Sequence, residues 1–85
     1  MQATPATVIV YSASWCAFCH AVKQHLMNLK VPYKEIEVDK DQAAAQELVA
    51  KTGMSAVPVV QIGNEIIVGF DRGRIDSALR ANKLV

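Results

Sequence analysis

The feature that most constrains the fold is a short apolar run, Thr7–Tyr11, followed closely by a Cys-x-x-Cys pair formed by Cys16 and Cys19. A β-branched, continuously apolar run of this length predicts a central strand buried on both faces. From about Ala17 to Lys30 the apolar residues follow a helical period, which predicts a helix there. The pair therefore lies where a buried strand passes into a helix. The expected inner face of that helix comprises Phe18, Val22, Leu26 and Leu29.

Charged and apolar residues alternate over residues 34–38, which predicts a half-exposed strand at a sheet edge. Either Asp39 or Asp41 can cap a second helix, because an Asp side chain accepts the unpaired N–H groups of a helix start. That helix is expected to stop near Gly53. The first two strands are joined by a helix, so we expect them to be parallel.

Two further apolar runs, Val57–Ile62 and Glu65–Val68, flank the dipeptide Gly63-Asn64, a pattern typical of a β-hairpin. Asp71 can cap a last helix. The expected order is βαβαββα, an α/β fold with a mixed four-stranded sheet and helices on both faces. At 85 residues, the chain is predicted to be a single domain over residues 1–85.

Composition narrows the function. The net charge is +1 with no basic run, which argues against nucleic-acid binding. No apolar run is long enough to span a bilayer and no secretory signal is visible, so a cytoplasmic, reducing location is expected. In such a compartment a cysteine pair is more often catalytic or metal-binding than structural.

Thiol–disulfide exchange needs one reachable thiolate and a second thiol that resolves the mixed disulfide. A helix start favours the thiolate through its partial positive charge and unpaired N–H groups. We therefore expect Cys16 to attack, with a lowered pKa, and the more buried Cys19 to resolve. His20 and Lys23 are candidates for additional positive charge by their helical spacing.

Other residues near the pair are candidates for substrate binding. Trp15, directly before Cys16, is expected to offer an apolar contact surface. Phe18 fits the inner helical face, although its place between the cysteines lets it border the substrate site. Pro58 stands at the start of the predicted third strand, and a cis bond there would turn the Val57 main chain toward an extended substrate.

The segments Cys16-Ala-Phe-Cys19, Ala56-Val-Pro58 and Val68-Gly-Phe-Asp71 together resemble the thioredoxin superfamily, specifically its glutaredoxin-like branch. The resemblance implies a thioredoxin-like fold with a cis proline beside a redox dithiol. It also implies reduction of protein disulfides or of protein–glutathione mixed disulfides, and it adds Gly69 and Asp71 as substrate-site residues. Gly69 also suits a tight bend, and Asp71 a helix cap.

Departures from the family pattern concern the electron donor. Glutaredoxins often carry a Lys three residues before the first cysteine, where this chain has Ala13. Arg72 stands where they have an Asp, and Trp15 is more similar to thioredoxin. The donor therefore stays open between glutathione, as a co-substrate, and a thioredoxin-reductase-type enzyme.

A cofactor carrier is the alternative class. The string Cys16-Ala-Phe-Cys-His20 fits the attachment pattern of c-type haem, with Met27 or Met54 as an axial ligand. The four possible zinc ligands lie on or at the start of one helix and cannot surround an ion together; they are Cys16, Cys19, His20 and His25. External thiols could instead join Cys16 in an iron–sulfur cluster between two copies of the chain. We expect a monomer with no metal and no tightly bound cofactor, and both histidines on a solvated helix face.

Overall fold

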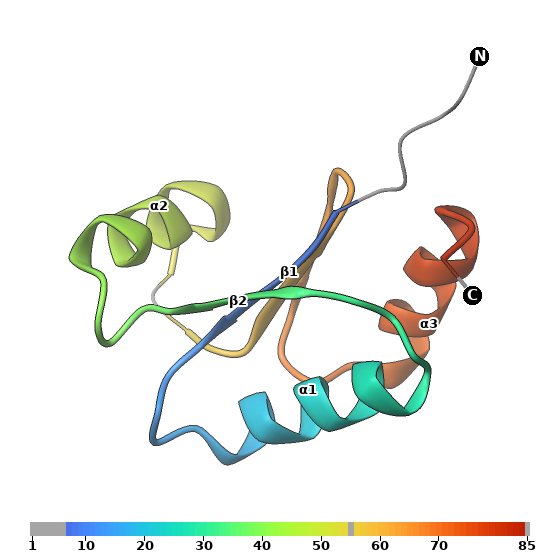
Figure 1. Cartoon of the computed structure of the whole chain (residues 1–85). Coiled ribbons are helices and arrows are strands. Elements are labelled where there is room, and N and C mark those ends of the chain that lie inside the picture. The colour runs from blue at the N-terminus through green and yellow to red at the C-terminus, as the bar shows by residue number, and fades with distance from the viewer. Residues whose placement is uncertain (1–6, 55, 85) are drawn as a thin grey trace.

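A four-stranded sheet runs through the described part of the molecule, with helices packed on both of its faces (Figure 1). The computed structural model describes residues 7–54 and 56–84. The predicted order βαβαββα is confirmed. The elements are β1 (Val8–Ser12), α1 (Ala17–Asn28), β2 (Lys34–Glu37), α2 (Gln42–Thr52), β3 (Val59–Ile62), β4 (Glu65–Val68) and α3 (Arg72–Ala81).

The strands lie in the order β2-β1-β3-β4. β1 is parallel to β2, as the helical crossover requires, and β3 is antiparallel to both β1 and β4. The β3–β4 hairpin turns at Gly63-Asn64, as predicted, and Gly63 has a positive φ of 60° that suits such a turn. β3 begins at Val59, so Val57 and Pro58 precede the strand instead of opening it.

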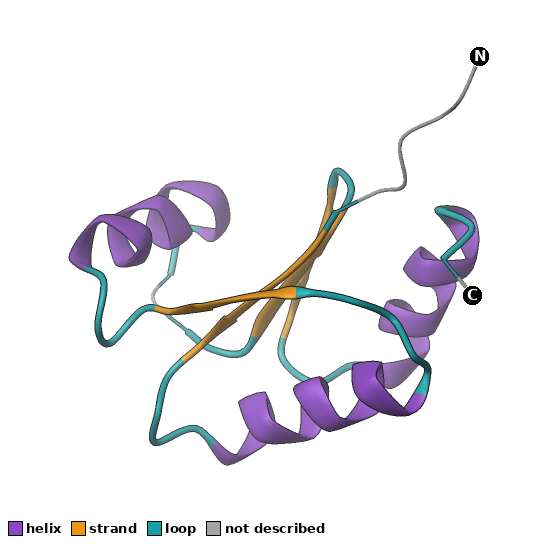
Figure 2. Ribbon diagram, viewed as in Figure 1, coloured by secondary structure: helices purple, strands orange, loops and turns teal. Residues whose placement is uncertain are grey.

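The two faces of the sheet are covered unequally: α1 and α3 lie on one side and α2 on the other (Figure 2). Val10 of β1 packs into the core beneath α1 and α3, whereas the next residue, Tyr11, packs against Leu48 of α2. β1 is therefore buried on both faces, as predicted. The core beneath α1 and α3 consists of Val8, Val10, Val22, Leu26, Val31, Val60, Ile62, Ile67, Ile75, Ala78 and Leu79.

The prediction of the inner face of α1 is wrong for its first and last residues, Phe18 and Leu29. Phe18 is 66% exposed and Leu29 is 38% exposed. The residues of α1 that face the sheet are Cys19, Val22 and Leu26, which follow the spacing i, i+3, i+7. Cys19 takes the inward position of the first turn, which rotates Phe18 outward, and Leu29 lies beyond the last turn as the C-cap residue.

The later helix boundaries follow the predicted signals. Asp41, and not Asp39, caps α2 by accepting the N–H of Ala44 at 3.1 Å, and α2 ends at Gly53, whose φ of 78° favours glycine. Asp71 caps α3. Within the described ranges, no helix combines the length and the apolar character needed to cross a membrane.

Candidate active site

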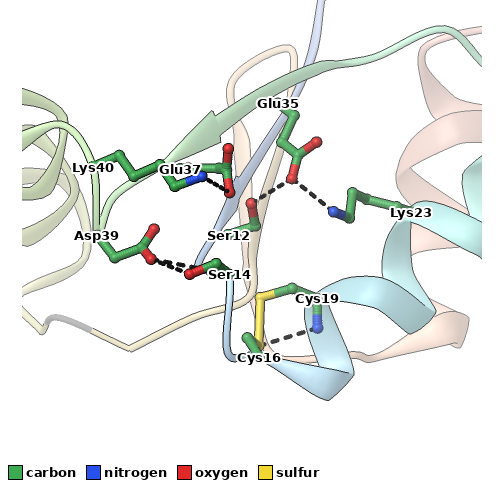
Figure 3. A network of polar contacts seen from close by, with 9 residues as sticks. All are labelled: Ser12, Ser14, Cys16, Cys19, Lys23, Glu35, Glu37, Asp39 and Lys40. Atoms are coloured by element: carbon green, nitrogen blue, oxygen red, sulfur yellow. Dashed lines mark hydrogen bonds and ion pairs between the residues drawn. A yellow bond between two sulfur atoms is a disulfide. The ribbon is translucent and has the colours of Figure 1, made fainter.

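The two cysteines lie at the start of α1 and are joined by a disulfide, with their Cα atoms 5.3 Å apart (Figure 3). Cys16 is the N-cap residue, with an extended backbone, and its Sγ accepts the N–H of Cys19 at 3.1 Å. The N–H of Cys16 in turn donates to the carbonyl of Ala13 at 3.1 Å, which closes the turn between β1 and α1. The local backbone thus places the first sulfur at the helix N-terminus.

The cysteines differ in exposure. Cys16 is partly exposed, whereas Cys19 is 1% exposed and packs beneath the first turn of α1. Once the bond is reduced, one sulfur can be reached from outside and the other is shielded. This is the asymmetry that a two-step exchange requires.

A buried hydroxyl and an ion pair lie close to this helix start. Glu35 of β2 accepts hydrogen bonds on one carboxylate oxygen from the Lys23 ammonium at 2.7 Å and from the Ser12 hydroxyl at 2.8 Å (Figure 3). The hydrogen bond from Lys23, followed by that from Ser12, lowers the pKa of Glu35. Lys23, predicted as a source of positive charge for the dithiol, is therefore paired with Glu35.

A second carboxylate holds the segment between β1 and Cys16. Both the backbone N–H of Ser14, at 3.2 Å, and its hydroxyl donate to Asp39 (Figure 3). The hydroxyl hydrogen bond is the main reason that the pKa of Asp39 is lowered. The β1–α1 connection is thus tied to β2 by Ser12 and to the following turn by Ser14, which fixes the position of Cys16.

Two candidate segments that are distant in sequence are brought together. The Val57–Pro58 bond is cis, as the resemblance implies. The Pro58 carbonyl accepts the N–H of Gly69 at 2.8 Å, so the segment before β3 and the segment after β4 are directly bonded. Gly69 has a φ of 86°, a conformation that favours glycine, and Asp71 is committed to capping α3 by accepting the N–H of Arg74 at 3.1 Å.

Trp15 and Phe18 stand out on either side of Cys16 along the chain, with exposures of 74% and 66%. Trp15 is therefore accessible, and its role as a contact surface stays a prediction. Large aromatic side chains normally lose water contact on folding, so two exposed rings beside one sulfur form a candidate binding surface. His20 is also exposed, as predicted.

Sequence reasoning missed His25, which it assigned to a solvated helix face. Its side chain is 12% exposed, and its Nε2 lies 2.7 Å from Oδ1 of Asp76 in α3. The available signal was its spacing three residues after the buried Val22, which places it at the edge of the inner face of α1. Within residues 7–54 and 56–84, no three His, Cys, Asp or Glu side chains gather closely enough to hold a metal ion.

Comparison with known proteins places this site in a family. A family model for glutaredoxin matches residues 8–67, a span that includes both cysteines and Pro58. The chain is similar to the glutaredoxin of Pseudomonas aeruginosa, with 32% identity over 81 residues that cover 87% of this chain and 96% of the relative.

Two solved structures extend the comparison to the fold. Buckwheat glutaredoxin in complex with glutathione matches with a TM-score of 0.76 and 28% identity, covering 93% of this chain and 78% of that one. NrdH-redoxin from Escherichia coli, a glutaredoxin-like protein with a thioredoxin-like activity profile, matches with a TM-score of 0.77 and 31% identity, covering 84% of this chain and 92% of that one.

The expected thioredoxin-like fold is confirmed by these structural matches. The Cys16–Cys19 pair at the start of α1, in such a fold, supports thiol–disulfide oxidoreductase activity. The chain belongs to the glutaredoxin family of the thioredoxin superfamily.

Proposed function

We propose that the protein reduces disulfides in proteins, or mixed disulfides between proteins and glutathione, by a two-step exchange. The Cys16 thiolate attacks one substrate sulfur, forms a mixed disulfide and releases the other substrate sulfur as a thiolate, which takes up a proton. Cys19, as a thiolate, then attacks the Sγ of Cys16 and releases the second substrate thiol. The substrate gains two electrons and two protons, and the Cys16–Cys19 disulfide is left.

The observation that carries this proposal is the cap position of Cys16. Its Sγ lies 3.1 Å from the N–H of Cys19, at the positive end of the α1 dipole. Both features favour a thiolate over a neutral thiol, because they stabilise negative charge on the sulfur. The burial of Cys19 keeps it from competing for the substrate and holds it ready behind Cys16.

We infer that the substrate contacts the surface around Cys16. The exposed rings of Trp15 and Phe18 support an apolar contact on one side. On the other side, we expect the Val57 main chain to pair with an extended substrate, and Gly69 and Asp71 to bind its more distant part. The hydrogen bond between Pro58 and Gly69 supports this, because it joins the two segments into one unit.

The test of the mechanism is a pair of variants. Cys16→Ser should abolish reduction of a protein disulfide, because the attacking sulfur is gone. Cys19→Ser should still attack and should accumulate a mixed disulfide that mass spectrometry detects, because nothing resolves it. Full activity in Cys16→Ser would refute the mechanism.

Two donors are proposed for reducing the resulting disulfide. Glutathione is supported by the similarity to the buckwheat glutaredoxin–glutathione complex. A thioredoxin-reductase-type enzyme is supported by the similarity to NrdH-redoxin, together with Ala13 and Trp15 in the sequence. Offering the oxidised protein either glutathione with its reductase or thioredoxin reductase, and following NADPH consumption, identifies the donor.

We further propose a cytoplasmic monomer without a tightly bound cofactor. The carrier alternative, haem or an iron–sulfur cluster held through Cys16, predicts a coloured protein. An absorption spectrum of freshly purified protein separates the two: a colourless monomer with a redox-active dithiol supports the oxidoreductase, and visible absorption bands would support the carrier.

A further inference from the structure

A contact between side chains fastens α1 to α3 and to the loop before it. The Nε2 of His25 lies 2.7 Å from Oδ1 of Asp76 in α3, and the His25 ring meets the ring of Phe70 edge-on, with centroids 6.1 Å apart and planes inclined by 68°. The side chain of His25 is 12% exposed and that of Asp76 is 33% exposed. Asp76 accepts the Nε2–H of the imidazole, so the bond needs no positive charge on His25.

Phe70 is the middle residue of the short Gly69–Asp71 segment, and both neighbours are already fixed. Gly69 donates its N–H to the carbonyl of Pro58 at 2.8 Å, and Asp71 caps α3. His25 holds the middle of the segment, because its ring lies against the ring of Phe70. Phe70 also packs against the core beneath α1 and α3.

Open space lies beside the contact between His25 and Phe70. A cavity of about 290 Å³ borders both rings, and Arg72 is the charged side chain in its lining besides the His25 imidazole. A Phe70 ring released from His25 therefore has room to shift. The full lining consists of Ala21, Gln24, His25, Asn28, Phe70 and Arg72.

We propose that His25 is a positioning residue that sets the Gly69–Asp71 segment relative to Cys16, and so determines the preference for glutathione-type substrates. This inference rests on the proposed function. Cys16 caps α1 and His25 lies within it, nine residues later and about 13.5 Å along the helix axis. A substrate that reaches from Cys16 to the segment is sensitive to this spacing, whereas a small disulfide that reaches only the sulfur is not.

The experiment uses the one tryptophan of the chain, Trp15, as a reporter beside the dithiol. The reduced protein is mixed with glutathione disulfide or with 2-hydroxyethyl disulfide, and fluorescence gives the second-order rate constant of each reaction. The variants are His25→Leu and Asp76→Leu, which break the bond. Matched to them are His25→Gln and Asp76→Asn, which keep a donor and an acceptor.

For both Leu variants we expect the ratio of the glutathione disulfide rate to the hydroxyethyl disulfide rate to fall about fivefold, through misplacement of the segment. The hydroxyethyl disulfide rate itself should stay at the wild-type value. The Gln and Asn variants should restore most of the ratio. Unchanged ratios, or an equal fall of both rates in the Leu variants, would overturn the positioning role. A wild-type protein that reacts with neither disulfide would instead overturn the proposed function, and this inference with it.

Discussion

The starts of α1, α2 and α3 share one geometry but use different atoms. At each start, a side chain on an extended residue accepts the backbone N–H three residues later at 3.1 Å. The acceptor is a carboxylate oxygen at Asp41 of α2 and at Asp71 of α3. At α1 it is the sulfur of Cys16.

The difference separates a structural cap from a reactive one. A carboxylate is charged at neutral pH and does not react with disulfides. Its hydrogen bond to the N–H group of the first turn stabilises the helix by about 1 kcal/mol. Sulfur is a weak acceptor when protonated or in a disulfide, and a strong one as a thiolate. The same cap geometry therefore has two roles. At α2 and α3 the carboxylate stabilises the helix whether the dithiol is oxidised or reduced, and at α1 the helix start stabilises the Cys16 thiolate.

The largest expected effect comes from giving α1 the cap of the other helices. Cys16→Asp should lower the rate of disulfide reduction by about a thousandfold or more, because the nucleophile is lost. It should nevertheless be about 1 kcal/mol more stable to urea than Cys16→Ala, because a carboxylate again accepts the first-turn N–H groups. Equal stability of the two variants would show that this helix start does not stabilise negative charge.

The carboxylate caps offer the converse test. Asp41→Ala and Asp71→Ala should each cost about 1 kcal/mol of unfolding free energy, measured by urea denaturation. Asp41→Ala should leave the rate with glutathione disulfide unchanged, since α2 lies on the other face of the sheet, while Asp71→Ala should slow it. Equal rates in the two variants would contradict the substrate role of the Gly69–Asp71 segment.

The smallest effect concerns a carboxylate near α1 that is not a cap. The pKa of Glu35 is lowered from its ordinary value of 4.5, chiefly by Lys23, so its contribution is complete above pH 4.5 and is lost as the pH falls through the lowered pKa. Wild type should therefore exceed Glu35→Gln in unfolding free energy at pH 7, by less than about 1 kcal/mol because the pair is partly exposed.

Urea denaturation at pH 7 and at pH 3 checks this, with Glu65→Gln, at the exposed first residue of β4, as the control. The gap between wild type and Glu35→Gln should be smaller at the lower pH, because the protonation of Glu35 weakens its bond to Lys23. A gap of the same size at pH 7 and at pH 3 would mean that the ion pair is not its source.

The sequence predicted the element order and the Cys16 position because both depend on local signals: apolar period, cap residues and a two-residue turn. It did not predict the orientation of Phe18, because Cys19 takes the inward position of the first turn of α1 and neighbouring residues of a helix point about 100° apart. The bond between Ser12 and Glu35 joins residues 23 apart, so no local pattern encodes it. His25 and Asp76 are 51 residues apart, and their contact likewise depends on how α1 and α3 pack.

Selective alkylation tests most directly whether α1 begins with a reachable thiolate. The reduced protein is treated with iodoacetamide near neutral pH, and peptide mapping by mass spectrometry follows each cysteine over time. We predict that Cys16 is labelled first and faster than the thiol of free glutathione, while Cys19 stays protected by its burial. Slow labelling of both cysteines at the same rate would contradict the account.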